Sequence, residues 1–135
     1  MDQNNQSKNE VLENTAINYA IINESIILVT FKVRQLDIYN ISYVKETLDT
    51  MYKNLTEENK KGFNLIIDFE LISYIDSSVV GALLNTWKQL HKIDKSLIFL
   101  NVKKVVCETL KILDVDKFFT ILNTLEECVQ CLMIT

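Results

Sequence analysis

The stretch Leu65–Leu84, LIIDFELISYIDSSVVGALL, decides the fold of this chain. Its first residues, Leu65 to Ile67, form a continuous apolar run ended by Asp68, which predicts a central strand covered on both faces. Asp76, Ser77 and Ser78 then precede a helix-like run. These residues start helices because their side-chain oxygens accept hydrogen bonds from N–H groups that lack intrahelical partners. A buried strand, a short connection and a capped helix therefore predict an α/β fold.

The segment Asp76-Ser77-Ser78 has two interpretations that the local sequence leaves open. In the first, the three side chains only cap the helix. In the second, a serine here is a modification site, because a phosphate would meet the same N–H donors and the positive end of the helix dipole.

Working outward, the hydrophobic pattern predicts further elements on both sides of this stretch. Ile17–Ile22 and Ser25–Val33 are typical of a hairpin turning at Asn23-Glu24, and Leu97–Leu100 of another buried strand. Apolar spacing predicts helices over 41–55, from Ser77 through Trp87 to Leu90, and over 102–113, with Val106, Leu110 and Leu113 in register. A short strand over 118–122 and a last helix capped by Thr124, with Leu125, Val129 and Leu132 on its core face, complete the alternation. Strands and helices that alternate from residue 64 onward indicate a largely parallel sheet.

Length and composition indicate one domain. The chain has 135 residues, of which 48% are hydrophobic, enough for a core. Residues 1–14 are rich in Asn, Gln, Lys and Glu and are predicted to form a disordered tail, which leaves the domain as residues 15–135.

Charge and hydropathy exclude several function classes. The net charge of −4 argues against direct binding of nucleic acid. No apolar run approaches the roughly 18–20 residues that span a bilayer, so membrane insertion is not expected. Three cysteines without an export signal indicate a cytoplasmic protein with free thiols.

The sequence contains no catalytic constellation, so we expect a protein that is not an enzyme and has no cofactor. The single histidine, His91, lies about 20 Å along the predicted helix from Ser77, too far for a Ser–His pair. No glycine-rich phosphate loop is present. Cys128-x-x-Cys131 is expected late in the last helix, where the dipole disfavours a reactive thiolate, so a redox or metal role is not expected.

The order and spacing of these motifs resemble the STAS family, which comprises anti-sigma factor antagonists and the cytoplasmic domains of sulphate transporters. Asp68 ends the strand and Asp76-Ser77-Ser78 begins the helix as in that family, and Gln35-Leu36-Asp37 matches the family's Gly-x-Leu/Ile-Asp. The resemblance implies a single α/β domain with a mixed four- or five-stranded sheet. It also implies that Ser77, and less readily Ser78, is the phosphoacceptor.

The same resemblance implies a partner-binding surface beside the serine. It would comprise Asp37, Tyr39, Asp76, Ser77, Ser78 and Val79. Val79 departs from the family pattern, which has glycine there. We expect its branched side chain at the partner-facing surface, where it docks a partner or obstructs a kinase.

The function implied is that of an anti-sigma factor antagonist in a partner switch. The unphosphorylated protein would bind an anti-sigma factor that is also a serine kinase, phosphorylation of Ser77 would end the binding, and a phosphatase would restore it. One alternative is a STAS subunit that docks on a membrane transporter or ATPase without a switch. Another is a module that senses a small ligand or nucleotide at the carboxyl ends of the strands.

Overall fold

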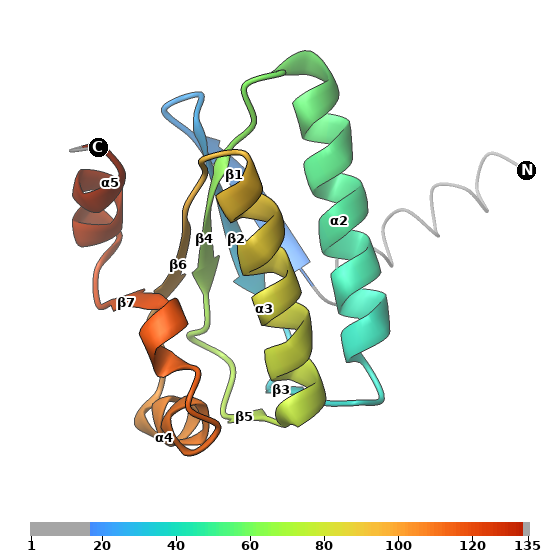
Figure 1. Cartoon of the computed structure of the whole chain (residues 1–135), viewed down its shortest axis with the longest axis vertical. Helices are drawn as coiled ribbons and strands as arrows, with labels where there is room; N and C mark the ends of the chain where they lie inside the picture. Colours follow the sequence, from blue (N-terminus) through green and yellow to red (C-terminus); the bar gives the residue numbers. More distant parts are fainter. Residues whose placement is uncertain (1–16, 134–135) are drawn as a thin grey trace, which may run out of the picture.

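The computed structural model describes residues 17–133 as one α/β domain (Figure 1). The elements in chain order are β1 (Ile17–Ile22), β2 (Ile26–Phe31), β3 (Gln35–Leu36), α2 (Ile41–Glu58), β4 (Asn64–Asp68), β5 (Tyr74–Ile75), α3 (Ser77–Lys92), β6 (Leu97–Leu100), α4 (Lys104–Ile112), the 3-10 helix η1 (Asp116–Phe118), β7 (Thr120–Leu122) and α5 (Leu125–Met133). The predicted tail, residues 1–14, lies outside the described residues.

The main sheet has five strands in the order β1-β2-β4-β6-β7, and its mixed character was predicted. β1 pairs antiparallel with β2, whereas the pairs β2–β4, β4–β6 and β6–β7 are all parallel. β4 is therefore central, and its residues Leu65, Ile66 and Ile67 are all buried. The prediction of a strand covered on both faces is confirmed.

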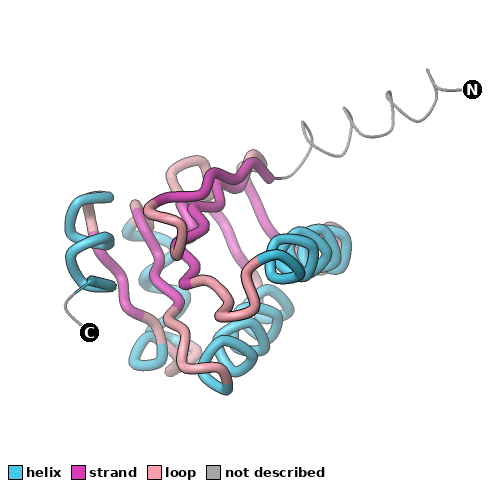
Figure 2. The backbone as a smooth tube through the Cα atoms, turned by 90° about the horizontal axis from the view of Figure 1, so that it is seen from above, coloured by secondary structure: helices cyan, strands magenta, loops and turns pink. Residues whose placement is uncertain are grey.

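Helices cover both faces of the sheet, which explains why its central strands contain continuous apolar runs. Helices α2 and α3 lie side by side on one face of the sheet, and α5 lies on the other (Figures 1 and 2). Leu65 and Ile67 face α2 and α3, while Ile66 between them packs in a second cluster with Cys128 and Leu132 of α5. Because side chains alternate along a strand, each of the strands β2, β4 and β6 contributes side chains to both clusters.

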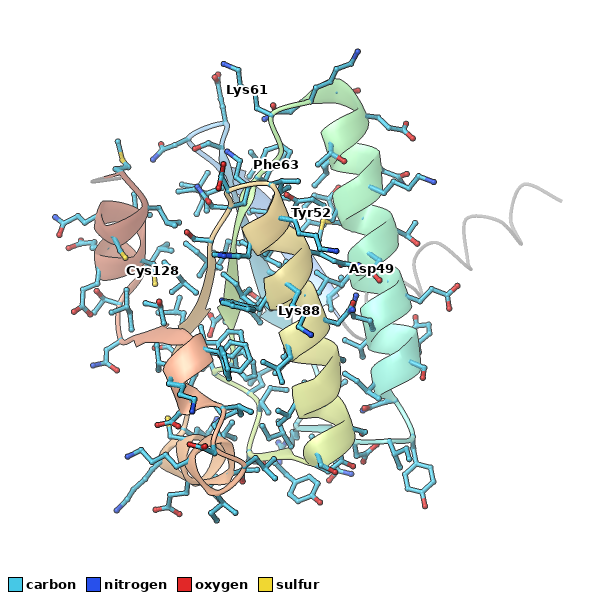
Figure 3. All side chains as sticks on the ribbon, viewed as in Figure 1. Asp49, Tyr52, Lys61, Phe63, Lys88 and Cys128 are labelled. Carbon is cyan, nitrogen blue, oxygen red and sulfur yellow. The ribbon has the colours of Figure 1, made fainter. Side chains whose placement is uncertain are left out.

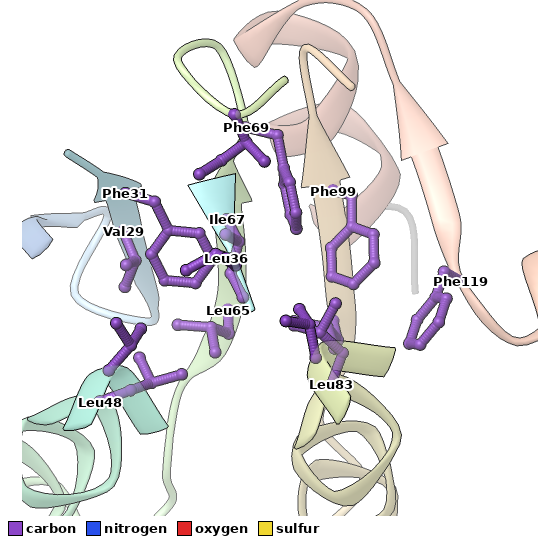
Figure 4. Close-up of a cluster of buried hydrophobic side chains, with 14 of the residues drawn as sticks. Val29, Phe31, Leu36, Leu48, Leu65, Ile67, Phe69, Leu83, Phe99 and Phe119 are labelled. Atoms are coloured by element: carbon purple, nitrogen blue, oxygen red, sulfur yellow. The ribbon is translucent and has the colours of Figure 1, made fainter. Parts of the chain in front are cut away.

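The larger cluster contains a connected set of phenylalanine side chains (Figure 4). Phe69 lies between Phe31 and Phe99, with ring centroids 5.6 Å and 4.7 Å away, and Phe99 stacks on Phe119 at 4.6 Å. Full burial of one such side chain contributes roughly 1.5–3 kcal/mol. The Phe69–Phe99 contact packs the chain just after β4 against β6.

Local hydrogen bonds set the turns of a chain that has two glycines and no proline. The predicted hairpin is present, and Asn23 and Glu24 have φ of 52° and 61°, as a type I′ turn requires. At the far end of α2, the Tyr52 hydroxyl donates to the Phe63 carbonyl at 2.8 Å and accepts from its N–H at 3.0 Å (Figure 3). This pair anchors the helix to the start of β4.

The C-terminal third differs from the prediction in detail. α4 starts at Lys104 rather than at 102, and Leu113, expected on its core face, follows the helix and is exposed. The expected strand over 118–122 is shorter, because Asp116–Phe118 turns as a 3-10 helix before β7 begins at Thr120. The chain must turn here to return to the sheet edge, which shortens both elements.

The predicted cap of the last helix is confirmed as a reciprocal pair. Thr124 Oγ1 accepts from the Glu127 N–H, and Glu127 Oε1 accepts from the Thr124 N–H, both at 3.1 Å. Leu125, expected in the core, is instead exposed, and Cys128 takes the buried position beside Leu132. No helix within residues 17–133 is long and apolar enough to cross a membrane.

Candidate functional site

A small parallel ladder brings two distant loops together. β3 pairs with β5 through Gln35–Tyr74 and Leu36–Ile75, so the loop after β3 lies beside the start of α3. The Ile38 N–H donates to Asp76 Oδ2 at 3.0 Å across this junction. The structure thus brings together the sequence-predicted residues Asp37, Tyr39, Asp76, Ser77 and Ser78.

Asp76 is the N-cap of α3. Its Oδ1 accepts from the N–H groups of Ser78 at 3.1 Å and Val79 at 3.2 Å, and also from the Ser78 hydroxyl. The Ser78 hydroxyl, followed by the N–H groups of Ile38, Val79 and Ser78, lowers the pKa of the Asp76 carboxyl below its ordinary value of 3.8. Asp76 therefore stays ionised and fixes the first turn of the helix.

The two serines differ in their availability. Ser78 is half-buried and its hydroxyl is held by Asp76. Ser77 is exposed, and within residues 17–133 its hydroxyl makes no hydrogen bond. The geometry leaves Ser77 as the accessible nucleophilic oxygen of the pair.

The helix donors that a phosphate on Ser77 was expected to meet already have partners. The N–H groups of Ser78 and Val79 already bond to the Asp76 carboxylate, and the Val80 N–H bonds to the Asp76 carbonyl at 3.3 Å. A phosphate on Ser77 would have to compete with a carboxylate for these donors, or project into solvent next to its negative charge.

The expectation that Val79 lies at the partner-facing surface is wrong. Val79 is 0% exposed and belongs to the main core cluster. Its spacing to Leu83, Thr86 and Leu90 places all four on the buried face of α3, a helical pattern that was visible in the sequence. Val79 positions the helix start from inside and cannot contact a partner.

The loop after β3 is held by its own polar side chains. Asp37 Oδ1 accepts from the Tyr39 N–H at 2.9 Å, Asn40 Oδ1 accepts from the Asp37 N–H at 2.9 Å, and Gln35 Nε2 donates to Asp37 Oδ2 at 2.9 Å. Asp37 thus shapes the loop, and the exposed fraction of the Tyr39 side chain reaches 94%.

Exposed apolar side chains surround the serine. Ile38 and Tyr39 from the loop, and Tyr74 from β5, are large, apolar and exposed. The sequence analysis did not single out Tyr74. No alternation in the sequence marked it, because Ser73 and Tyr74 are both exposed between the buried Ile72 and Ile75.

Asp68 ends β4 and makes its side-chain hydrogen bonds in the loops that follow β4 and β6, not with the residues around Ser77. Its Oδ1 accepts from the Glu70 N–H at 2.9 Å and from Asn101 Nδ2 at 3.3 Å. The carboxylate therefore links the loop after β4 to the loop after β6.

Cys128 and Cys131 lie on α5, and His91 lies at the opposite end of α3 from Ser77. Cys128 is the fourth residue of α5 and not late in it as expected, and Cys131 is exposed (Figure 3). Burial, with smaller contributions from Cys131, Glu127 and Asp68, raises the pKa of the Cys128 thiol to about 11. His91 stacks on Trp87 with ring centroids 5.1 Å apart, and Trp87 packs against the core as predicted.

Comparison with known families now settles what kind of domain this is. The family profile described as STAS domain matches residues 20–128. The chain belongs to the STAS domain family. This STAS domain has the mixed sheet flanked by helices that the resemblance implied, and Asp76 caps the helix α3 that follows β5.

Solved structures share the fold at low sequence identity. The anti-sigma factor antagonist SpoIIAA in its unphosphorylated form has a TM-score of 0.69 and 19% identity, covering 89% of this chain and 98% of that one. The phosphorylated form of SpoIIAA from Bacillus has a TM-score of 0.60 and 18% identity, covering 85% and 97%. The murine anion transporter Slc26a9 has a TM-score of 0.69 and 14% identity over 96% of this chain, which spans 24% of the transporter chain.

Proposed function

We propose that this STAS domain is a non-enzymatic regulatory protein that acts as an anti-sigma factor antagonist in a partner switch. With Ser77 unphosphorylated, it binds an anti-sigma factor that is also a serine kinase, and so releases a sigma factor. The kinase transfers the γ-phosphoryl group of ATP to Ser77 Oγ, releasing ADP and a proton, and the complex dissociates. A phosphatase hydrolyses the phosphoserine and resets the cycle.

The observation that carries this proposal is the contrast between the two serines. Ser77 has an exposed hydroxyl without a partner among residues 17–133, while the Ser78 hydroxyl is engaged by Asp76. A protein kinase needs a hydroxyl that can enter its active site, so the geometry favours Ser77. The likeness to SpoIIAA, whose structure exists in unphosphorylated and phosphorylated forms, supports the same assignment.

The surface around Ser77 supports binding by apolar contact. Ile38, Tyr39 and Tyr74 offer exposed apolar area within the reach of one interface, and tyrosine is favoured at interfaces because it combines apolar area with a polar tip. Asp37 and Asp76 make the same surface acidic, which favours a partner with basic residues facing them.

The phosphate would end binding through charge. It adds about −1.5 to −2 units at pH 7 to a surface that already holds two carboxylates. Since Asp76 occupies the nearby N–H donors, the fold offers little compensation for the new charge. The cost falls on the interface, which would have to desolvate a dianion against an apolar patch.

The test combines mass spectrometry of the protein from its native cell with binding titrations. We expect phosphate on Ser77 and none on Ser78. Ser77→Ala should bind the kinase as tightly as wild type, and Ser77→Asp more weakly, with both variants folded. Ser78→Ala is the matched control, which should still be phosphorylated. Absence of phosphate under all growth conditions, together with equal affinities for both Ser77 variants, would leave a constitutive docking module.

The likeness to Slc26a9 favours one second candidate, a STAS subunit that docks on a membrane transporter. In that case the exposed apolar surface would bind a permease or its ATPase with no dependence on Ser77. Co-purification with transport components that is unchanged by Ser77→Asp would favour this candidate over the partner switch.

A further inference from the structure

The strand β1 forms one outer edge of the five-stranded sheet. It pairs with β2 through six residues, Ile17 to Ile22, and no strand among the described residues lies on its other side. In an antiparallel pair, every second residue of an edge strand directs its N–H and C=O away from the sheet. β1 therefore presents a row of main-chain donors and acceptors to its surroundings.

This edge carries none of the devices that normally prevent pairing between sheets. Its sequence, INYAII, contains no charge, no proline and no glycine. Natural proteins usually protect a long edge with lysine, proline or a bulge, or keep the edge strand short. The opposite edge is formed by β7, which has only three residues. Within residues 17–133, β1 is thus the long edge that has no strand beside it.

The face of β1 next to α2 is incompletely covered. The Tyr19 and Ile21 side chains, 52% and 48% exposed, lie on the face that Ile17 also shares. A groove of about 490 Å³ runs between this strand and α2, with Tyr19 on one wall and Met51 and Leu55 on the other. A strand added to the β1 edge would extend the sheet beneath this groove and direct apolar side chains toward it.

We propose that β1 is a dimerisation strand that pairs antiparallel with β1 of a second copy across a two-fold axis. When two identical strand edges are related by a two-fold axis, the donors of each edge face the acceptors of the other. Every contact between residue i of one copy and residue j of the other then occurs twice. If β1 carried a charged residue, pairing it with an identical strand would bring like charges together. The sequence INYAII has no charged residue, so this repulsion does not arise. Tyr19 and Ile21 of each copy pack toward the partner's groove, and the two five-stranded sheets become continuous.

The segment before β1 is a less suitable occupant of the same edge. Residues 1–16, MDQNNQSKNEVLENTA, contain few apolar residues and no run that matches INYAII in length. A strand from a different protein would also fit the main-chain groups. Such a strand would not be related to β1 by two-fold symmetry, so neither its main-chain groups nor its side chains would match those of β1 in the way that a second β1 does.

Sedimentation velocity of the full chain is the first measurement. We expect the mass of two chains at high protein concentration, dissociating on dilution. In Tyr19→Lys/Ile21→Lys, four lysines would meet at the two-fold axis, so this variant should sediment as one chain while keeping its far-UV circular dichroism. Val105→Lys/Ile112→Lys is the matched control. It replaces two exposed apolar residues of α4, which are 50% and 82% exposed, with the same charges, and it should still dimerise.

Hydrogen exchange supplies a second readout that does not depend on any variant. The outward N–H groups of β1 should exchange more slowly as protein concentration rises, while the amides of α4 should not respond. A wild-type chain that stays monomeric up to millimolar concentration overturns the proposal. So does a dimer that the β1 lysines leave intact, or one that the α4 lysines also dissociate. If only a chain lacking residues 1–16 dimerises, those residues cover the edge and the proposal is equally wrong.

Discussion

Asp76 accepts four hydrogen bonds from two parts of the chain: three come from the first turn of α3 and the fourth from the Ile38 backbone. One carboxylate therefore starts the helix, restrains the Ser78 hydroxyl and anchors the neighbouring loop. Among residues 17–133, no group holds the Ser77 hydroxyl. At the residue scale, this acid makes the hydroxyls of two adjacent serines differ in availability.

The lowered pKa of Asp76 gives a pH-dependent contribution to stability. A folded-state pKa below 3.8 means that the unfolded chain binds this proton more tightly. The contribution is present above the unfolded value and is lost as pH falls through the folded pKa. We expect the difference in unfolding free energy between wild type and Asp76→Asn to be constant near neutral pH and to shrink in the acid range below pH 3.8. Urea titrations across this range measure it, and a difference independent of pH would contradict the assigned hydrogen bonds.

At the scale of elements, the sequence predicted most of what the structure contains. The hairpin, α2, the start of α3 and the cap of α5 followed from apolar spacing and capping residues. The two-residue strands β3 and β5 could not be predicted, because their pairing joins segments 39 residues apart and leaves no periodic pattern. Val79 was misplaced because the family motif was given more weight than its helical spacing to Leu83. The first gap concerns a tertiary contact that local sequence does not encode, whereas the burial of Val79 followed from its helical spacing.

Val79→Gly tests the corrected role of α3's first turn. The change removes a fully buried side chain, which costs roughly 1.5–3 kcal/mol, and adds about 1 kcal/mol for glycine in a helix. We therefore expect a large drop in the thermal midpoint, and no gain in the rate at which a kinase labels the folded protein. Val79→Ala should fall between wild type and Val79→Gly. Faster labelling without loss of stability would return Val79 to the surface role.

α5 covers the second face of the sheet. Two of its leucines, one buried and one exposed, allow the contribution of core packing to be measured within one helix. Leu132 packs with Ile26, Ile66 and Ile98, whereas Leu125 is 37% exposed. Leu132→Ala should destabilise the protein by about 2–3 kcal/mol. Leu125→Ala, the matched control, should cost less than about 1 kcal/mol. Denaturant midpoints measure both, and equal losses would show that α5 does not pack as described.

The whole molecule is built around a sheet whose central strands contribute to two cores. β4 places Leu65 and Ile67 in the cluster under α2 and α3, and Ile66 in the cluster under α5. Because the same strands supply both cores, unfolding of one core would also remove the strands of the other. The domain is therefore one cooperative unit, despite having helical layers on opposite faces.

This arrangement predicts a single unfolding transition. Trp87, the only tryptophan, lies on α3 and packs against Phe118 with ring centroids 5.4 Å apart, so its fluorescence reports one layer. Far-UV circular dichroism reports the helices of both layers. The two signals should change with the same denaturant midpoint, as for a two-state domain. A dichroism change that precedes the fluorescence change would mean that α5 unfolds separately.

The hydrogen bond between Ile38 and Asp76 has a consequence for how such a domain can diversify. The donor is the backbone N–H of residue 38, so the bond survives any substitution there except proline. The side chain at this position, 65% exposed, contributes little to the scaffold. Sequence change can therefore alter the exposed side chain of this loop while the architecture that holds it stays intact. The surface that the loop presents can change by single substitutions, without an intermediate that fails to fold.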